Sequence, residues 1–521
     1  MYSNKENVNI LTSLLVAHGV KHAVVCPGSR NAPIVHNLSE CPDIQCYPVT
    51  DERSAAFYAL GMTIALDEPV VVCVTSGTAL LNVAPAVAEA YYQHRPMVVV
   101  SADRPPQWID QLDGQTLPQP DALGRFVRKA VTLPEPRDDE ERWYCNRLIN
   151  EALIVTHAPV HINVPISEPL FDFTVAQLPA ERKIEVLRAA LPSQLVSQVC
   201  RKFVQSRQPM LIDGQPMNPL MDEAVLLVSD DERYVPDFVL YIGGSIVSKR
   251  MKRFLRKAKE TWVVNETGEV TDTFMNVTHI VQGDGALVTD QVRFMLEQQP
   301  HPFVQQWQVL FERIRRQVSA YEPPYSQMAA VKYFEQQRSS LTTNHSPLTT
   351  HYANSMAIRL ANIYARQRVY CNRGVNGIEG TLSTAAGHAA VTDEPVCCVI
   401  GDLSFFYDSN ALWNQNLRGN LRILLLNNGR GGIFNMLPGL EQSPARDRFV
   451  AAEHNTSAEG VCRQNGIVYL KATKMEEMQQ GIDTLLNIES QRPILLEVFT
   501  RPADDQATLQ AYYQGVVDLG L

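Results

Sequence analysis

Two short polar motifs in the last third of the chain carry the residue types that bind a divalent metal ion. Gly401-Asp402 ends the apolar run 396–400, and Asn427-Asn428 ends a second run, 421–426, after twenty-four intervening residues. Both motifs are predicted at the carboxyl ends of buried parallel strands, where open α/β sheets place ligands. Asp402 offers a carboxylate oxygen, Asn428 an amide oxygen and Arg430 a backbone carbonyl, which together suit Mg²⁺ with a diphosphate completing its octahedron. Taken alone, a Gly-Asp pair after a strand is also typical of an ordinary turn.

A glutamate near the amino terminus could contact the other end of the same cofactor. Residues 45–50 predict a strand, Asp51-Glu52 follows it, and residues 53–61 predict a helix with small side chains. The pattern Glu-x-x-Ala-x-x-x-Ala-x-Gly, from Glu52 to Gly61, resembles the surroundings of the glutamate that contacts the aminopyrimidine ring in thiamine-diphosphate enzymes. An acid in the first turn of a helix is otherwise a cap that complements the helix dipole. The metal motif favours the cofactor interpretation, because independent motifs for both ends of one cofactor rarely coincide.

A third segment supports the same interpretation. The buried-strand run 70–74 ends in the small-residue turn Thr75-Ser76-Gly77, and the segment from Leu80 to Asn82 opens a predicted helix. Thr-Ser-Gly-x-x-x-x-Asn after an apolar strand resembles the second pyrimidine-domain motif of the same superfamily. The first and last thirds of the chain thus resemble the pyrimidine and diphosphate domains of these enzymes.

Further motifs narrow the resemblance to one family. They are Cys26–Pro33, Ser101–Pro106, Asn372–Gly374, Ile378–Gly380 and Gly432–Phe434. With them the chain resembles the 2-succinyl-5-enolpyruvyl-6-hydroxy-3-cyclohexene-1-carboxylate synthase family of the menaquinone pathway, densely in the first and last thirds and faintly in the middle. That family of transferases joins 2-oxoglutarate, with loss of carbon dioxide, to isochorismate: the succinyl carbanion formed on the cofactor adds to isochorismate in conjugate fashion.

The resemblance implies which residues bind thiamine diphosphate and its metal ion, Mg²⁺ or Mn²⁺. The metal ligands are Asp402, Asn428 and the carbonyl of Arg430. Ile378 is the bulky residue beneath the cofactor, and Leu403 and Arg430 stand where many members of the superfamily have glycine. The cofactor-binding set is Glu52, Ser76, Gly77, Asn82, Ser355, Ile378, Gly401, Asp402, Leu403, Asn428, Ile433 and Phe434.

Several cations are expected to converge on the substrates, because each substrate that the resemblance implies carries carboxylates. The forked guanidinium of arginine can bind a carboxylate through two parallel hydrogen bonds. Any single arginine is nevertheless more often a solvated surface cation. Ser355 and Arg359 are spaced i, i+4, and so are expected on one helix face. The resemblance implies the substrate-binding residues Arg30, Arg104, Gln115, Lys249, Ser355, Arg359 and Arg373, and the catalytic residues Glu52, Ser29, Arg30, Gln115, Arg359 and Arg373.

Composition excludes several classes of function. A net charge of −10 argues against nucleic acid or an anionic membrane as the main partner. No apolar stretch approaches the roughly twenty residues of a membrane span, and the amino terminus lacks the apolar core of a signal peptide. The ten cysteines include no Cys-x-x-Cys pair, which predicts buried reduced thiols in a cytoplasmic protein.

The alternation of strand and helix patterns predicts three α/β domains, each a doubly wound parallel sheet. They are expected at residues 1–180 (pyrimidine-binding), 181–335 (central) and 351–521 (diphosphate- and metal-binding). A polar linker is predicted at 336–350. In the last domain, strands are predicted at 368–372, 396–401, 421–427, 467–471 and 493–499. The central domain has no Gly-x-Gly-x-x-Gly motif and no sign of a flavin site.

Two alternatives to this function stay open. One is a related 2-oxoacid decarboxylase or acetolactate-type enzyme, against which the arginines argue. The other is a non-catalytic scaffold, against which intact Glu52, Asp402 and Asn428 argue.

A homodimer or dimer of dimers is expected, with the cofactor between the first domain of one chain and the last domain of another. Four histidines are interpreted as structural, since the cofactor carries its own acid–base group: His18, His22, His36 and His388.

Overall fold

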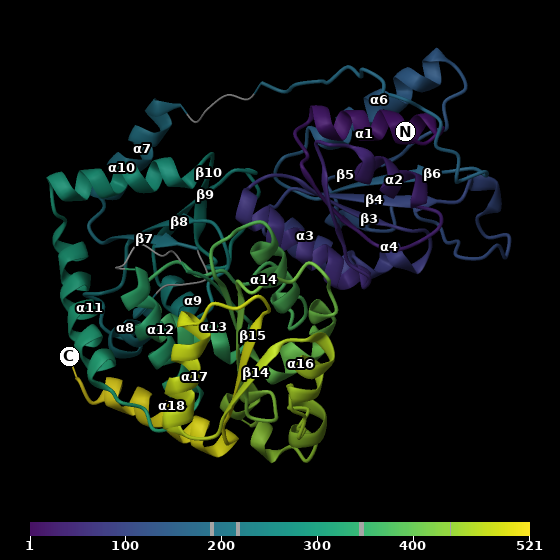
Figure 1. Cartoon of the computed structure of the whole chain (residues 1–521). Coiled ribbons are helices and arrows are strands. Elements are labelled where there is room, and N and C mark those ends of the chain that lie inside the picture. The colour runs from purple at the N-terminus through teal and green to yellow at the C-terminus, as the bar shows by residue number, and fades with distance from the viewer. Residues whose placement is uncertain (188–191, 215–218, 343–347, 438, 521) are drawn as a thin grey trace.

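A computed structural model describes residues 1–187, 192–214, 219–342, 348–437 and 439–520. The chain forms three α/β units, each built on a sheet whose strands pair in parallel. Figure 1 shows the N-terminal unit in purple and blue, the central unit in teal, and the C-terminal unit in green and yellow. The predicted fold class, three parallel-sheet α/β units, is confirmed.

The N-terminal sheet has the strand order β2-β1-β3-β4-β6-β5. Its apolar runs are continuous because both faces are covered: Val71 packs in one core, and its neighbours Val70 and Val72 pack in the other. The strands are β1 (His22–Val25), β2 (Gln45–Pro48), β3 (Val70–Val74), β4 (Met97–Asp103), β5 (Lys129–Thr132) and β6 (Val160–Pro165). The helices are α1 (Glu6–Ala17), α2 (Ala32–Glu40), α3 (Glu52–Leu66), α4 (Thr78–Asn82), α5 (Ala84–Tyr92) and α6 (Asp139–Leu153).

The central sheet has the order β10-β9-β8-β7. Helices α7 and α10 pack on each other, as do α8 and α9. The strands are β7 (Pro209–Asp213), β8 (Phe238–Ile242), β9 (Glu260–Asn265) and β10 (Val277–Gln282). The helices are α7 (Ser193–Gln205), α8 (Met221–Val228), α9 (Lys249–Leu255), α10 (Gly285–Gln298) and α11 (Pro302–Ala320).

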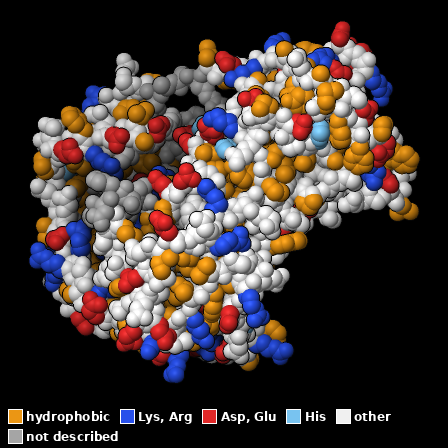
Figure 2. Space-filling model, viewed as in Figure 1, with side chains coloured by type: hydrophobic (Ala, Val, Ile, Leu, Met, Phe, Trp, Pro, Cys, Tyr) orange, Lys and Arg blue, Asp and Glu red, His pale blue; other side chains and the backbone are white. Residues whose placement is uncertain are grey.

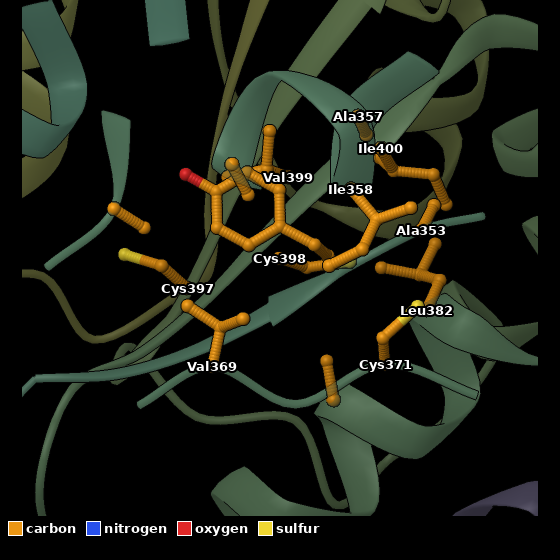
Figure 3. Close-up of a cluster of buried hydrophobic side chains, with 14 of the residues drawn as sticks. Ala353, Ala357, Ile358, Val369, Cys371, Leu382, Cys397, Cys398, Val399 and Ile400 are labelled. Atoms are coloured by element: carbon orange, nitrogen blue, oxygen red, sulfur yellow. The ribbon is translucent and has the colours of Figure 1, made fainter. Parts of the chain in front are cut away.

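The C-terminal sheet has the order β11-β12-β13-β15-β14. Figure 3 shows side chains of β12 with residues of α13 and α14 in the buried cluster beside this sheet. The strands are β11 (Thr349–Tyr352), β12 (Val396–Gly401), β13 (Leu421–Asn427), β14 (Val468–Ala472) and β15 (Ile494–Phe499). The helices are α12 (Gln327–Thr342), α13 (Met356–Tyr364), α14 (Thr381–Ala390), α15 (Asp402–Tyr407), α16 (Glu459–Asn465), α17 (Met475–Asn487) and α18 (Pro502–Val517).

Helices α3 and α14 join the N-terminal and C-terminal units (Figure 1). Two glycines allow their backbones to approach closely. A Cβ atom on Gly61 would lie 1.9 Å from the carbonyl oxygen of Thr384, and one on Gly387 would lie 1.9 Å from that of Tyr58. Gly61, the last residue of the glutamate motif, therefore serves the contact between the two helices.

Three expectations about local structure were wrong. Residues 336–350 are no simple linker, because α12 continues to Thr342 and the edge strand β11 begins at Thr349; residues 343–347 lie outside the described part. Ser339 and Ser340 fit this helix by donating their hydroxyls to carbonyls four residues earlier. Residues 368–372 form only an isolated bridge, His351 to Tyr370. The β-branched residues Thr349 and Thr350 supply the edge strand instead.

The third error concerns Ser355. It precedes α13 as its N-cap residue with φ 72°, and so does not share a helix face with Arg359. Arg359 nevertheless reaches back to it, because its Nη1 donates to the Ser355 carbonyl over 2.7 Å.

The N-terminal sheet also contains a strand that the sequence did not predict, β5 at the edge.

Candidate active site

The predicted metal ligands lie together at the carboxyl ends of β12 and β13. Asp402 is buried, and its Oδ2 accepts the backbone N–H groups of Asn428 (3.1 Å), Gly429 (2.7 Å) and Arg430 (3.2 Å). The register explains this arrangement, because Gly401 pairs with Leu426 and both chains leave the sheet at the same edge. The loop after β13 therefore wraps around the Asp402 carboxylate.

The donor set of this loop fits Mg²⁺ bound together with a diphosphate. The Asn428 amide nitrogen donates to Asp505, which leaves its oxygen on the opposite side. Among the described residues, the carbonyl of Gly429 is engaged by His454 N–H, whereas that of Arg430 accepts no hydrogen bond. The described part of the chain holds no group of three or more His, Cys, Asp and Glu residues that could bind a metal ion. A Mg²⁺ ion at this loop would complete its octahedron with oxygens from water or from a diphosphate.

Glu52 begins α3, but it does not cap that helix. The cap is Asp51, whose Oδ1 accepts the N–H groups of Arg53 (2.9 Å) and Ser54 (3.1 Å). Glu52 Oε2 instead accepts a hydrogen bond from the Asn82 amide over 3.3 Å, which brings together two of the predicted cofactor-binding residues. Asp51 is thus the hydrogen-bonding cap, whereas Glu52 is an acid in the first turn of α3 whose carboxylate accepts from Asn82 and from no N–H group of the helix among the described residues.

The turn after β3 has a backbone that requires glycine. Gly77 has φ 84° and ψ −140°, and a Cβ atom there would meet the backbone of Gln115 at 3.2 Å. Gln119, which the sequence did not reveal, fixes this contact: its Oε1 accepts Gly77 N–H over 2.7 Å, and its Nε2 donates to Asn163 over 2.8 Å. Ser76, Gly77 and Gln115 are thus held beside one another by a fully buried amide.

The cations predicted in the N-terminal unit form one group. Arg30 is buried, donates to the Ile166 carbonyl and pairs with Glu168, both over 2.9 Å. Burial, together with the nearby charge of Arg104, lowers the pKa of Arg30. Arg104 lies 3.3 Å from Asp113 and donates to the Gly114 carbonyl, just before Gln115. Ser29 is exposed next to Arg30.

A second cationic group lines a cavity of about 720 Å³ between the central and C-terminal units. Lys249, Arg359 and Ile433 all line it, and Ile433 lies just after the loop that wraps around Asp402. Burial, and then the charge of Arg373, lowers the pKa of Arg359, which places these two arginines near each other. Phe434 follows Ile433 in the same helical turn, and Ile378 is 42% exposed.

Arg250 is a cavity-lining cation that the sequence analysis missed. It pairs with Asp222, which also accepts bonds from Ser248 and from the Tyr513 hydroxyl. Its position next to Lys249 was the only available signal. Glu223, beside Asp222, is fully buried and accepts the Tyr512 hydroxyl over 2.9 Å.

The histidines have structural partners, as predicted. His18 bonds to Asn150 over 2.9 Å, His22 bonds to the Tyr47 hydroxyl over 3.2 Å, and His36 stacks on Phe173. His388 is buried against His351, with ring nitrogens 3.1 Å apart. Burial lowers the pKa of His388 to about 4.

Within one chain no direct bond in the described ranges joins the two groups of predicted residues. No hydrogen bond or ion pair in the described ranges joins Glu52, Arg30 or Arg104 to Asp402, Arg359 or Arg373. Neighbours of Glu52 do contact the C-terminal unit: Arg53 donates to the Tyr407 carbonyl, and Asp51 accepts from Asn410.

Family models match the first and the last parts of the chain. The model of the N-terminal TPP-binding domain of thiamine pyrophosphate enzymes matches residues 6–123, and that of the C-terminal TPP-binding domain matches 352–498. The described part of the chain has no helix that is both long and apolar enough to cross a membrane.

Relatives named 2-succinyl-5-enolpyruvyl-6-hydroxy-3-cyclohexene-1-carboxylate synthase match almost the whole chain. One from Bacteroides fragilis is 43% identical over 98% of this chain and 99% of its own length. Those from Bacteroides thetaiotaomicron and Phocaeicola vulgatus are 41% and 40% identical over 98% and 99% of this chain, and 99% of their own lengths. The chain belongs to the 2-succinyl-5-enolpyruvyl-6-hydroxy-3-cyclohexene-1-carboxylate synthase family of thiamine pyrophosphate enzymes.

Proposed function

We propose that this enzyme decarboxylates 2-oxoglutarate and adds the resulting succinyl group in conjugate fashion to isochorismate, forming 2-succinyl-5-enolpyruvyl-6-hydroxy-3-cyclohexene-1-carboxylate for menaquinone biosynthesis. Thiamine diphosphate, when bound, supplies a thiazolium that stabilises the negative charge left by the departing carbon dioxide. The observation that carries the proposal is the cavity in which Lys249, Arg250 and Arg359 surround space for a polyanionic substrate, immediately beside the Asp402 loop.

Residues of the C-terminal unit bind the diphosphate end of the cofactor in this proposal. Asp402, the Asn428 amide oxygen and the Arg430 carbonyl hold Mg²⁺ or Mn²⁺, which neutralises the diphosphate. Gly401 and Leu403 flank the aspartate, and the Leu403 N–H orients its second oxygen over 2.7 Å. The remaining contacts come from Ser355, Ile378, Ile433 and Phe434.

Residues of the N-terminal unit bind the pyrimidine end. The Glu52 carboxylate holds a proton at the ring nitrogen N1′ of the aminopyrimidine, a pairing that a dry pocket strengthens. Asn82 orients that carboxylate through its 3.3 Å hydrogen bond. Ser76 and Gly77 present the close-packed turn that the Gln119 amide holds in place.

The cations divide the substrate carboxylates between them. Arg30, Arg104 and Gln115 form one group with Ser29, and Lys249, Arg359 and Arg373 form the other, near Ser355. Arg373 Nε is buried without a hydrogen-bond partner among the described residues, and so is available to a carboxylate. An apolar acceptor, as in an acetolactate-type enzyme, would bring no carboxylate to the half-buried Arg359 and Arg373, which have no ion-pair partner among the described residues.

Two copies of the chain are proposed to share each site, in a homodimer or dimer of dimers. Among the described residues no direct bond joins the two groups within one chain, and this arrangement is compatible with the N-terminal group of one copy facing the C-terminal group of another. Large apolar side chains near both groups are exposed, among them Leu81, Tyr92, Val375 and Ile378. Figure 2 shows hydrophobic side chains gathered over the N-terminal unit.

The domain limits and the location of the protein are also proposals. Each sheet supports one domain, with the first limit near residue 180. The second lies near Gln327 instead of the expected 335, because α12 packs against α13 and α17 of the C-terminal unit. All ten cysteines are free, which suits a reducing compartment and supports a cytoplasmic location.

The proposed function is tested by incubating the protein with thiamine diphosphate, Mg²⁺, 2-oxoglutarate and isochorismate. Carbon dioxide release and the adduct are measured together, and pyruvate replaces 2-oxoglutarate as the matched control. We expect equimolar carbon dioxide and adduct with 2-oxoglutarate and neither with pyruvate. Carbon dioxide release from pyruvate with none from 2-oxoglutarate would instead establish the acetolactate-type alternative.

A further inference from the structure

Glu89 is a buried carboxylate in an otherwise uncharged helix. It lies in α5, is 3% exposed, and is the one charged residue among Ala84–Tyr92. Its Oε1 accepts the N–H of Gly374 over 2.6 Å and its Oε2 accepts that of Val375 over 2.7 Å. The Gln93 amide adds a third donor at 2.6 Å. Three donors thus compensate a charge that burial would otherwise make costly.

The loop that Glu89 holds belongs to the C-terminal unit. Gly374 and Val375 directly follow Arg373 and come shortly before Ile378. A Cβ atom on Gly374 would lie 2.7 Å from the Glu89 carbonyl oxygen and 3.0 Å from Tyr92 Cβ, so this loop rests directly on α5. Two consecutive N–H groups on one carboxylate fix the direction in which the loop leaves Arg373.

Asn354 holds the same loop from within the C-terminal unit. Its Nδ2 donates to the carbonyls of Asn372 (2.7 Å) and Gly377 (2.8 Å), and its Oδ1 accepts Arg373 Nη1 over 3.0 Å. Asn354 comes from the C-terminal unit itself, at the end of β11. Glu89 is therefore the contribution of the N-terminal unit to the placement of Arg373.

The charge of Glu89 also acts on Arg373. Burial lowers the pKa of Arg373, and interactions with Cys371 and with the Glu89 carboxylate oppose this shift. Glu89 makes no ion pair with Arg373 among the described residues. The arginine therefore keeps its guanidinium available while its backbone is fixed through the two following amides.

We propose that Glu89 is a positioning residue for the reaction: its carboxylate holds the loop from Arg373 to Ile378, so that both side chains keep the placement that substrate and cofactor need. The inference rests on the proposed function. Asn82, which contacts Glu52, lies just before α5. The segment from Asn82 to Glu89 thus supports residues of both the pyrimidine end and the substrate end.

The test uses the full-length protein with Glu89→Gln and Glu89→Ala. Gln keeps the volume and one acceptor oxygen, but it places an amide donor against one of the two N–H groups, and Ala removes both acceptors. Glu68→Gln is the matched control, because Glu68 is a half-exposed glutamate of the same unit whose one ion pair in the described part of the chain is with Lys21. Hydrogen–deuterium exchange across residues 372–380 is measured with melting temperature, kcat and KM.

We expect exchange of the Gly374 and Val375 amides to accelerate about tenfold or more in both variants, the effect of losing bonds to a charged acceptor. KM for the acid that Arg373 binds should rise about tenfold, more in the Ala variant than in the Gln variant, because Gln retains one bond. Affinity for thiamine diphosphate with Mg²⁺ should fall by less than the KM effect, because Ile378 supplies only one of the proposed cofactor contacts and neither Glu52 nor the metal ligands are touched. Glu68→Gln should match wild type in all of these measurements.

Unchanged exchange in this loop overturns the proposal. A lowered melting temperature with wild-type KM and kcat overturns it too, because Glu89 would then only join the two units. If the wild-type protein consumes neither acid, the proposed function fails by itself. Exchange across 372–380 then decides whether Glu89 holds the loop.

Discussion

The carboxylate of Asp505 accepts a hydrogen bond from the side-chain amide of Asn428 over 3.0 Å. The Thr500 hydroxyl and the Gln327 N–H also donate to it, at 2.8 Å each. An ionised carboxylate only accepts, so the nitrogen of the Asn428 amide faces Asp505 and the oxygen faces away. Asp505 thereby selects which end of Asn428 is offered to a metal ion, although the sequence alone suggests only an acid in the first turn of a helix.

Asp505→Ala is expected to weaken Mg²⁺ binding about tenfold or more, the usual effect of losing a residue that orients a metal ligand. The measurement is a Mg²⁺ titration in the presence of thiamine diphosphate, followed by thermal stabilisation. Asp504→Ala is the matched control, since Asp504 is an exposed acid in the same helical turn. Equal Mg²⁺ affinities for the two variants would show that Asp505 does not orient Asn428.

Glu52→Gln should retain the fold and metal-dependent cofactor binding while losing turnover. Asp51, not Glu52, caps α3, so the helix keeps its N-terminal hydrogen bonds in this variant. Loss of the carboxylate removes the group that holds a proton on the aminopyrimidine. Steady-state turnover is compared with melting temperature, and near-normal turnover would exclude the cofactor role of Glu52.

Sharing of each site between copies predicts complementation. Glu52→Gln and Asp402→Ala should each be inactive alone, because every site then lacks one group. Co-expression should restore about a quarter of wild-type activity if copies pair at random, since half the dimers are mixed and each mixed dimer has one intact site. Absence of recovery in verified mixed dimers would place both groups of each site in one chain.

The sequence predicted the strands that end at the site better than the elements that hold the site together. The runs 396–401 and 421–427 are buried on both faces, so their composition alone indicated strands. β11 was missed because Thr349 and Thr350 are polar, although they complete the edge of the sheet. The isolated bridge at Tyr370 shows that an apolar tripeptide, Val369 to Cys371, need not pair as a strand.

Local motifs named the candidate residues that adjacent strand ends bring together, but they did not indicate the side chains that act over long separations in the sequence. Asp402, Asn428 and Arg430 meet because adjacent strands end together, a relationship that spacing encodes. Glu89 and Gln119 act through backbone N–H groups far away in the sequence. In the sequence each is simply a polar residue beside small or apolar ones, and this pattern does not indicate which N–H groups it binds.

The four arginines should separate into two kinds of defect. Loss of one that binds 2-oxoglutarate should abolish carbon dioxide release as well as adduct, whereas loss of one that binds only isochorismate should spare carbon dioxide release. Removing a partner from a desolvated carboxylate costs about 2–5 kcal/mol, so defects of roughly thirtyfold or more are expected in Arg30→Ala, Arg104→Ala, Arg359→Ala and Arg373→Ala. Arg316→Ala is the control, because Arg316 is an exposed cation. Wild-type behaviour in all four variants would exclude these cations from the site.

Glu223 predicts a pH dependence of stability. Burial, reinforced by the charge of Asp222, raises the pKa of Glu223 from 4.5 to about 7, while the Tyr512 hydroxyl and the charge of Arg250 oppose the shift. Between these two values the unfolded chain ionises and the folded chain retains its proton. Stability therefore falls as pH rises from about 4.5 to 7, by roughly 3–4 kcal/mol in total at roughly 1.4 kcal/mol per unit.

Glu223→Gln, which is neutral at every pH, should remove this loss of stability. The measurement is the melting temperature of both proteins at pH 5, 6, 7 and 8, and the variant should gain on wild type up to pH 7 and no further. Tyr512→Phe is the second arm: it removes a hydrogen bond that lowers the pKa of Glu223, so the wild-type loss should extend to higher pH. A constant difference between Glu223→Gln and wild type at all four pH values would show that Glu223 ionises alike in the folded and unfolded chains.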